Sequence, residues 1–354
     1  MFKFTNMFTN MFTKKDGAPI LKNESGESTG SRIAKLLFKY NAVLILVAMF
    51  IVASIISEVF LSPENMMNIL RQQSTFMLVA LGVFMVVLSG GIDLSVNSIV
   101  AITSIMVAYM LKVVGWENEP WGLTASICIA ILTGFLVGAI NGYLAAKLNM
   151  PAFIVTLAMM YAVKGLSYIV TDANTILLNQ SVPAVEVLGG FATGSAAGIP
   201  YPVILMIILI AIFALIMHFT SFGRLMTATG SNETAVLLAG INPIKYKFWA
   251  YSLCGTLCGV AGVIVTARTC SATALTTGVN YDMTAIASVV IGGASLKGGE
   301  GNVPMTVVGV FILAVIGNIM NLVSLGVYPQ LVVKAIIIIL AVMLKGFSSK
   351  STTV

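Results

Sequence analysis

The sequence predicts an all-α, polytopic integral membrane protein of about ten transmembrane helices, with both termini in the cytoplasm. Apolar residues fill 58% of the 354 positions and charged residues 9%, whereas soluble domains average about 45–50% and about 25%. The mean hydropathy is +1.00, and the apolar residues form long runs rather than the short alternating segments of a membrane β-barrel. Since backbone groups inside a bilayer must bond within their own segment, these runs are predicted to be helices.

Ten apolar runs of roughly membrane-spanning length divide the chain. They are expected at residues 40–61, 74–88, 94–112, 123–148, 152–171, 202–219, 248–266, 283–296, 304–325 and 327–345. A polar break is expected at 62–73, an interfacial loop with two tryptophans at 115–122, and a long connection rich in small residues at 172–200. Residues 1–39 and 347–354 are expected to be cytoplasmic tails on a transmembrane domain of residues 40–346.

The basic residues support this topology. With ten spans and the N-terminus inside, the inner segments hold 14 of the 19 lysines and arginines, as the positive-inside rule requires. Nine or eleven spans would place a basic terminus outside. The net charge of +6 is therefore explained by topology and does not predict nucleic-acid binding, because the charges are scattered at segment ends.

Residues 221–247, which we call the polar segment, form a weakly basic stretch between two apolar runs, and the topology places it in the cytoplasm. A short helix is predicted over 232–238. Asn232 is a suitable N-cap, and the acidic Glu233 lies in the first turn, where the helix dipole favours it. Gly240 is expected to end the helix and Pro243 to prevent its continuation. A short helix at the end of a membrane domain is a suitable binding element for another protein.

Two glycine-rich turns interrupt apolar runs near the cytoplasmic side. The first glycine turn, SGGIDLSVNS, covers residues 89–98, and the second, IGGASLKGGEG, covers residues 291–301. Their glycine pairs, Gly90–Gly91 and Gly292–Gly293, permit sharp turns and close helix approach. Asp93 has two interpretations. It caps the third helix, with Ser95 and Asn97 satisfying nearby backbone groups, or it contacts a solute or gate.

Other polar residues within the apolar runs offer little chemistry. Asparagines such as Asn141 and Asn318 are expected to join helices, with pore contact as the alternative. The four cysteines are expected to be buried thiols rather than disulfides or ligands, and with a single histidine no metal site is predicted. The phosphate-loop pattern, the HExxH motif and the nucleophile elbow are absent from the sequence. Any ATP consumed must therefore be hydrolysed by another chain.

Several long motifs, in a fixed order, resemble the membrane permeases of bacterial sugar ABC importers, the group of ribose, galactose, xylose and autoinducer-2 permeases. The resemblance runs from about residue 40 to residue 346. It is carried by the first glycine turn, GAINGYLAAKLNMPAFIVTLAMM (138–160), the polar segment, YDMTAIASVVIGGASLKGGEG (281–301) and YPQLVVKAIIIILAVML (328–344).

The resemblance implies a permease subunit in the bacterial cytoplasmic (inner) membrane that binds no cofactor itself. The implied partners are a cytoplasmic ABC ATPase that hydrolyses ATP with Mg²⁺, an extracytoplasmic sugar-binding protein, and a second permease copy or a sister permease. The mechanism implied is alternating access that brings a monosaccharide or related small polar solute into the cell.

The family also implies that the polar segment holds the helix that couples to the ATPase. The coupling residues expected on this basis are Gly230, Asn232, Glu233, Ala235, Leu237, Leu238, Gly240 and Ile241. Val236 and Leu237 replace an Ala-Arg pair of the family pattern, so the contact with the ATPase is expected to be more apolar than is usual in the family.

Translocation-path or gate residues are expected at Gly90, Gly91, Asp93, Ser95, Asn97, Asn141, Gly292 and Gly293. The alternatives are an ion-coupled secondary transporter acting alone, which usually needs several ionisable groups at the membrane midplane, and a non-transporting membrane scaffold. The chain offers few such groups.

Overall fold

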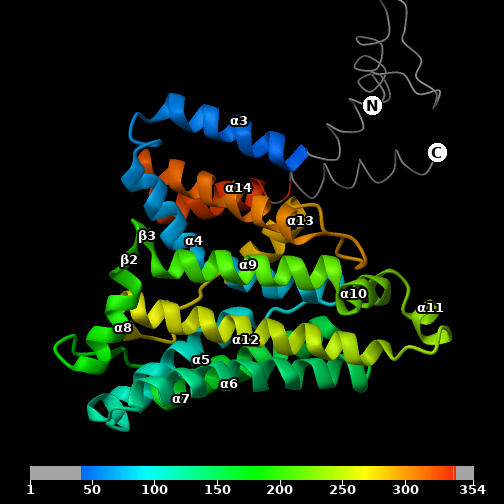
Figure 1. The fold of residues 1–354 in the computed structure, drawn as a ribbon, viewed down its shortest axis with the longest axis horizontal. Helices are drawn as coiled ribbons and strands as arrows, with labels where there is room; N and C mark the ends of the chain where they lie inside the picture. Colours follow the sequence, from blue (N-terminus) through cyan, green and yellow to red (C-terminus); the bar gives the residue numbers. More distant parts are fainter. Residues whose placement is uncertain (1–40, 338, 340–354) are drawn as a thin grey trace, which may run out of the picture.

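The computed structural model describes residues 41–337 and residue 339. The two expected tails, 1–39 and 347–354, and the end of the last predicted span lie outside this range. Within it, ten apolar helices form an elongated bundle (Figure 1). They are α3 (Asn41–Ile56), α4 (Pro63–Leu88), α5 (Val96–Ala108), α6 (Gly122–Gly142), α7 (Ala152–Thr171), α9 (Tyr201–Phe219), α12 (Pro243–Thr269), α13 (Tyr281–Ile291), α14 (Val303–Leu322) and a helix at Val327–Ile337.

These helices correspond one to one to the ten predicted runs and confirm the polytopic all-α class. Seven are long and apolar enough to cross a membrane, and α3, α13 and Val327–Ile337 are shorter apolar helices. Single π-helical turns extend α5 and α6, namely η1 (Tyr109–Val113) and η3 (Tyr143–Lys147), and a 3-10 turn, η2 (Trp116–Asn118), follows η1.

The predicted polar break at 62–73 is wrong, because α4 begins at Pro63 and continues to Leu88. The Ser62 hydroxyl accepts a hydrogen bond from the Asn65 backbone N–H at 3.2 Å, which caps the helix. Proline is tolerated in the first turn, where no intrahelical partner for its missing N–H exists. The polar residues of this stretch therefore lie on the first turns of a spanning helix.

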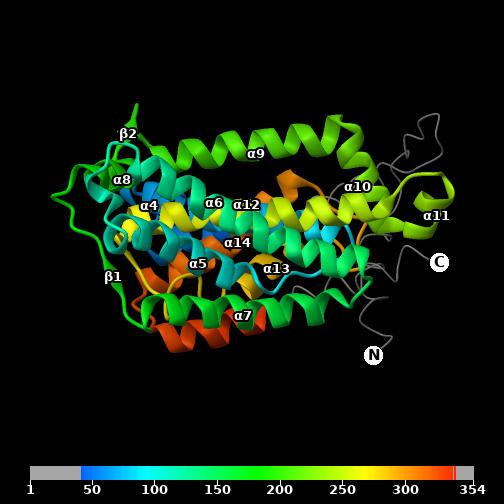
Figure 2. The same ribbon diagram turned by 90° about the horizontal axis from the view of Figure 1, so that it is seen from below.

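The long connection at 172–200 has secondary structure of its own, which was not predicted. It contains α8 (Pro183–Thr193), started by a proline in the first turn, and three short strands: β1 (Ile176–Leu177), β2 (Ser195–Ala196) and β3 (Ile199–Pro200). β2 and β3 pair as an antiparallel hairpin, and β1 pairs antiparallel with β4 (Ser271–Ala272), with Ile176 opposite Ala272. These elements gather at one end of the bundle, and α10 (Ser221–Ser231) and α11 (Glu233–Leu238) lie at the other (Figures 1 and 2).

The centre of the bundle is built on α4 and α12, which are largely buried within the chain. α12 packs against α6, α4 and α5. By contrast α6, α7 and α9 have few fully buried side chains, as expected of helices at the lipid-facing surface of a bundle. This explains Cys128, whose thiol was expected to be buried but is exposed on α6, whereas the other three cysteines are buried.

Glycines allow α6 and α12 to approach closely. A methyl group on Gly134 would lie 2.3 Å from the Gly255 carbonyl oxygen, and one on Gly138 would lie 2.3 Å from the Tyr251 carbonyl oxygen. Small residues four positions apart let two helix backbones pack without side chains between them, which is a principal source of helix association in membranes. The pairing fixes α12, whose N-terminal end leads back to α11.

Candidate functional site

The polar segment folds into two helices and the first turns of α12. Only one helix was expected there, but α10 precedes it, capped by the Thr220 hydroxyl, which accepts from the Gly223 N–H at 3.4 Å. The predicted short helix is confirmed as α11. Asn232 caps it by accepting the Ala235 N–H at 2.9 Å, and Gly240 follows in the left-handed conformation with φ of 78°. Pro243 then starts α12.

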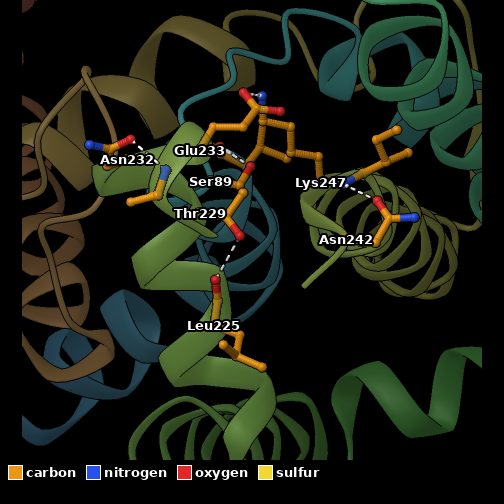
Figure 3. A network of polar contacts seen from close by, with 10 residues as sticks. Ser89, Leu225, Thr229, Asn232, Glu233, Asn242 and Lys247 are labelled. Carbon is orange, nitrogen blue, oxygen red and sulfur yellow. Dashed lines mark hydrogen bonds and ion pairs between the residues drawn. The ribbon is translucent and has the colours of Figure 1, made fainter. Parts of the chain in front are cut away.

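The outer surface of α11 is apolar. Leu237 and Leu238 are 60% and 83% exposed, whereas Val236 is 6% exposed. Of the two residues expected to make the grip apolar, Leu237 therefore faces outward and Val236 packs inward. Glu233 of α11 and Lys247 of α12 form an ion pair and point toward one another in Figure 3. The pair ties α11 to the bundle while its leucines remain available to a partner.

The last turn of α10 lies against both glycine turns. The Gly299 N–H donates to the Leu88 carbonyl at 2.9 Å, and the Ser231 hydroxyl donates to the Gly299 carbonyl at 3.4 Å. A methyl group on Gly230 would lie only 1.9 Å from the Leu88 carbonyl oxygen and 2.6 Å from the Gly299 nitrogen. Three segments that are distant in sequence thus meet backbone to backbone.

We call Gly90, Gly230, Gly298 and Gly299 the glycine junction. A methyl group on Gly298 would lie 2.8 Å from both the Gly230 carbonyl oxygen and the Gly90 Cα. Gly90, Gly298 and Gly299 have φ of 83°, 91° and 74°, a conformation that glycine adopts without strain. Sequence reasoning identified Gly90 and Gly230 but missed Gly298 and Gly299. Their signal was the second glycine pair in the motif KGGEG.

A buried polar cluster stands behind the first glycine turn. Asp93 is fully buried, and its Oδ1 accepts from the Ser95 N–H at 2.8 Å and from the Ser95 hydroxyl at 2.6 Å. The Asn141 amide donates to the Ser95 hydroxyl at 2.8 Å, which joins α6 to the turn. Burial raises the pKa of the Asp93 carboxyl, and the bonds from Ser95 oppose that rise. Asp93 thus shapes the turn before α5.

Asn97 differs from the expectation that it would satisfy backbone groups. Its amide nitrogen lies 3.8 Å from the Met160 sulfur, and its carbonyl oxygen accepts from the Ser98 hydroxyl at 3.0 Å. The turn is held instead by Asp93 and Ser95, with Thr156 and Tyr251 donating to the Ile92 carbonyl, each at 3.3 Å. In consequence Asn97 sits at the α5–α7 interface, a contact that local sequence does not reveal.

Seven of the eight predicted path or gate residues lie in the two glycine turns, and the eighth is Asn141. None of them lines the cavity around Arg71 or the cavity beside His218. Gly91 packs on Tyr251, and Gly292 packs on the backbone of Met305. A solute-contact role for these residues stays a prediction. Their positions are those of tightly packed turns beside α10.

Sequence reasoning also missed a second buried acid. Asp282, in the first turn of α13, is 8% exposed and lies within the electrostatic reach of Lys164. Its signal was its position at the start of an apolar run. Across residues 41–337, groups of three or more His, Cys, Asp or Glu side chains placed to bind a metal ion do not occur.

Comparison with known proteins places this architecture in a family. The family described as branched-chain amino acid transport system / permease component matches residues 65–342. The ribose import permease protein RbsC of Haemophilus influenzae is 36% identical over 328 residues, which cover 93% of this chain and 98% of that protein. RbsC of Bacillus subtilis is 40% identical over 294 residues, covering 83% and 88%.

The L-arabinose transport system permease protein AraH of Escherichia coli is 32% identical over 319 residues, which cover 88% of this chain and 92% of that protein. No solved structure matches. The chain therefore belongs to the permease family of bacterial sugar ABC importers and is a multi-pass protein of the inner membrane.

Proposed function

We propose that the chain is the membrane subunit of an ATP-driven importer that moves a monosaccharide or related small polar solute into the cell by alternating access. A separate ABC ATPase hydrolyses ATP with Mg²⁺, a soluble binding protein delivers the solute, and a second permease copy or a sister permease completes the pore. The observation that supports this most directly is α11, which leaves Leu237 and Leu238 exposed at one end of the bundle and is linked through α10 to both glycine turns.

The link suggests how movement of the ATPase reaches the membrane. A partner that grips α11 displaces α10, and the last turn of α10 touches Leu88 at the end of α4 and Gly299 just before α14. These contacts are between backbones, with no flexible side chain to absorb the displacement. Close-packed interiors transmit strain, so the displacement shifts the cytoplasmic ends of α4 and α14 together.

The experiment that tests the coupling role replaces both exposed leucines with Leu237→Asp and Leu238→Asp. Burying a leucine stabilises a complex by about 1.5–3 kcal/mol, so ATPase recovered with the permease in mild detergent should fall at least about tenfold. The matched control is Leu275→Asp, an exposed leucine of the loop between β4 and α13 at the opposite end. Undiminished recovery of the ATPase with the double variant would refute the assignment.

The alternative, an ion-coupled carrier acting alone, requires no exposed apolar helix on the cytoplasmic side. It would leave α11 without a role, and transport by the double variant would then equal that of the unaltered chain.

A further inference from the structure

A cavity of about 810 Å³, lined by basic, amide, aromatic and aliphatic side chains, lies in the half of the bundle away from α11. The first turns of α4 and α13, the last turns of α12 and α14, and the helix Val327–Ile337 line it. α4 and α13 end at the glycine turns, which lie against α10, and α14 begins there. The opposite ends of these helices, which line the cavity, are therefore far from α10. The volume falls in the range of small-molecule sites, roughly 300–1,000 Å³.

The side chains of this cavity are rich in hydrogen-bond donors. Arg71, Arg268 and Lys334 line it, and the described lining residues include neither Asp nor Glu. Amides from Asn68, Gln72, Asn321 and Gln330 add donors and acceptors. Phe76 and Tyr281 form an aromatic wall, with ring centroids 5.5 Å apart and an edge-to-face arrangement.

The positions of the basic residues in the chain make their clustering in this cavity notable. Five of the 19 basic residues fall outside the inner segments of the topology: Arg71, Lys112, Lys164, Arg268 and Lys334. Lys112 lies 3.8 Å from Glu117, and Lys164 is near Asp282. The other three all line this one cavity. A cluster of charges within a largely apolar bundle is costly, and such a cluster is a candidate functional site.

Two local features bear on what the cavity could bind. The Nε atom of Arg71 is buried and has no hydrogen-bond partner among the described residues, which is rare in folded proteins and calls for a ligand or ordered water. Gln330 is held by bonds to the Asn321 side chain at 2.8 Å and to the Leu325 carbonyl at 2.9 Å. Lys334 follows Gln330 by one helical turn and shares its face.

We infer that this cavity is where the permease itself holds the transported solute, and that it accepts a small polyhydroxylated molecule without positive charge. The guanidinium, ammonium and amide groups donate to hydroxyl and ring oxygens, while the aromatic wall covers the apolar C–H face of a sugar ring. The three cations repel a cationic solute such as an amino sugar. The inference rests on the proposed function in that the solute passes through this chain.

The first experiment measures the potential in the cavity and does not require transport. Asn68→Cys is introduced into a chain carrying Cys128→Ser, which leaves only buried cysteines elsewhere. Anionic and cationic thiol reagents of equal size are compared in membranes. The anionic reagent should react about tenfold faster, and millimolar ribose or arabinose should slow the reaction whereas glucosamine should not. The control, Val187→Cys on exposed α8, should show no protection by sugar.

The second experiment measures uptake in the assembled importer. Arg71→Gln and Lys334→Gln should each lower ATP-driven uptake at subsaturating sugar roughly ten- to a hundredfold, because hydrogen bonds from charged groups are lost. Recovery of the ATPase with these variants should be unchanged, and Arg71→Lys should restore part of the uptake. The control Lys112→Gln removes an outer-side charge that does not line the cavity.

The outcomes separate the two claims. If the unaltered importer takes up sugar and both glutamine variants do so equally well, the cavity inference is overturned and the proposed function stands. Equal rates for the two thiol reagents, or failure of both neutral sugars to protect Asn68→Cys, would also overturn it. If the unaltered complex shows no ATP-driven uptake, the proposed function fails, while the labelling result still reports on the cavity.

Discussion

The substitution Gly230→Ala isolates the link between α10 and the two glycine turns. Its methyl group would lie 1.9 Å from the Leu88 carbonyl oxygen and 2.6 Å from the Gly299 nitrogen, distances at which the backbones must separate. The separation strains or breaks the 2.9 Å bond from the Gly299 N–H to Leu88. α11, which holds the proposed ATPase-binding leucines, is unchanged, so association with the ATPase should persist.

The magnitude follows from three contributions. Overpacking costs about 1–3 kcal/mol, loss of a backbone hydrogen bond costs about 0.5–1.5 kcal/mol, and alanine in a helix regains about 1 kcal/mol over glycine. The net loss of about 0.5–3.5 kcal/mol falls on the intact junction and lowers its population by a factor between about 2 and about 300. The variant should therefore hydrolyse ATP with little uptake.

The assay compares sugar uptake per ATP hydrolysed in proteoliposomes that contain the complete importer. Gly165→Ala in α7 is the matched control, because a methyl group there meets nothing within 4 Å, and its uptake per ATP should equal that of the unaltered chain. The reasoning is refuted if Gly230→Ala retains normal uptake per ATP. It is equally refuted if the variant permease folds and inserts but no longer binds the ATPase, since the glycine junction would then be part of the ATPase-binding surface.

Two further predictions concern the packing of the bundle. Asn65 and Asn318 exchange two hydrogen bonds, at 3.0 and 2.8 Å, so either alanine variant should lose about 1–3 kcal/mol, because the remaining asparagine loses both of these bonds. The Asn65 amide keeps its separate bond to the Phe60 carbonyl at 2.7 Å. In thermal unfolding the Asn65→Ala, Asn318→Ala double variant should lose less than the sum of the two single losses, and strict additivity would contradict the pairing. Gly255→Val should lower the unfolding temperature in detergent more than Gly165→Val, because a Cβ at Gly255 meets Gly134 O at 2.1 Å; equal effects would show that α6 and α12 do not pack as described.

The fold class was predictable because composition and run length act over whole segments. Ten helices match ten runs, and α11 was found because its cap, its acidic first turn and its closing glycine are local signals. The start of α4 was also encoded locally, as serine, proline and glutamate in the order of a helix N-terminus. It was misread because the polar residues that follow resemble a loop, when in the structure several of them line the cavity around Arg71.

The contacts that matter most to the candidate site had no local signal. Gly90, Gly230 and Gly299 are far apart in the chain, and only tertiary packing reveals that their backbones touch. The same holds for the cavity, where Arg71, Arg268 and Lys334 come from three different helices. Each of them alone is a basic residue in or near an apolar run, which by itself indicates no site.

Reconstitution into liposomes tests the central claim most directly. The purified chain is inserted with its ATPase partner or alone, with the binding protein outside and ATP inside, and in a parallel sample with a proton or sodium gradient but no ATP. Labelled sugar should accumulate only when ATPase and ATP are present, at a rate that the Leu237→Asp, Leu238→Asp variant abolishes. Accumulation driven by the ion gradient in liposomes that contain this chain alone would contradict the account.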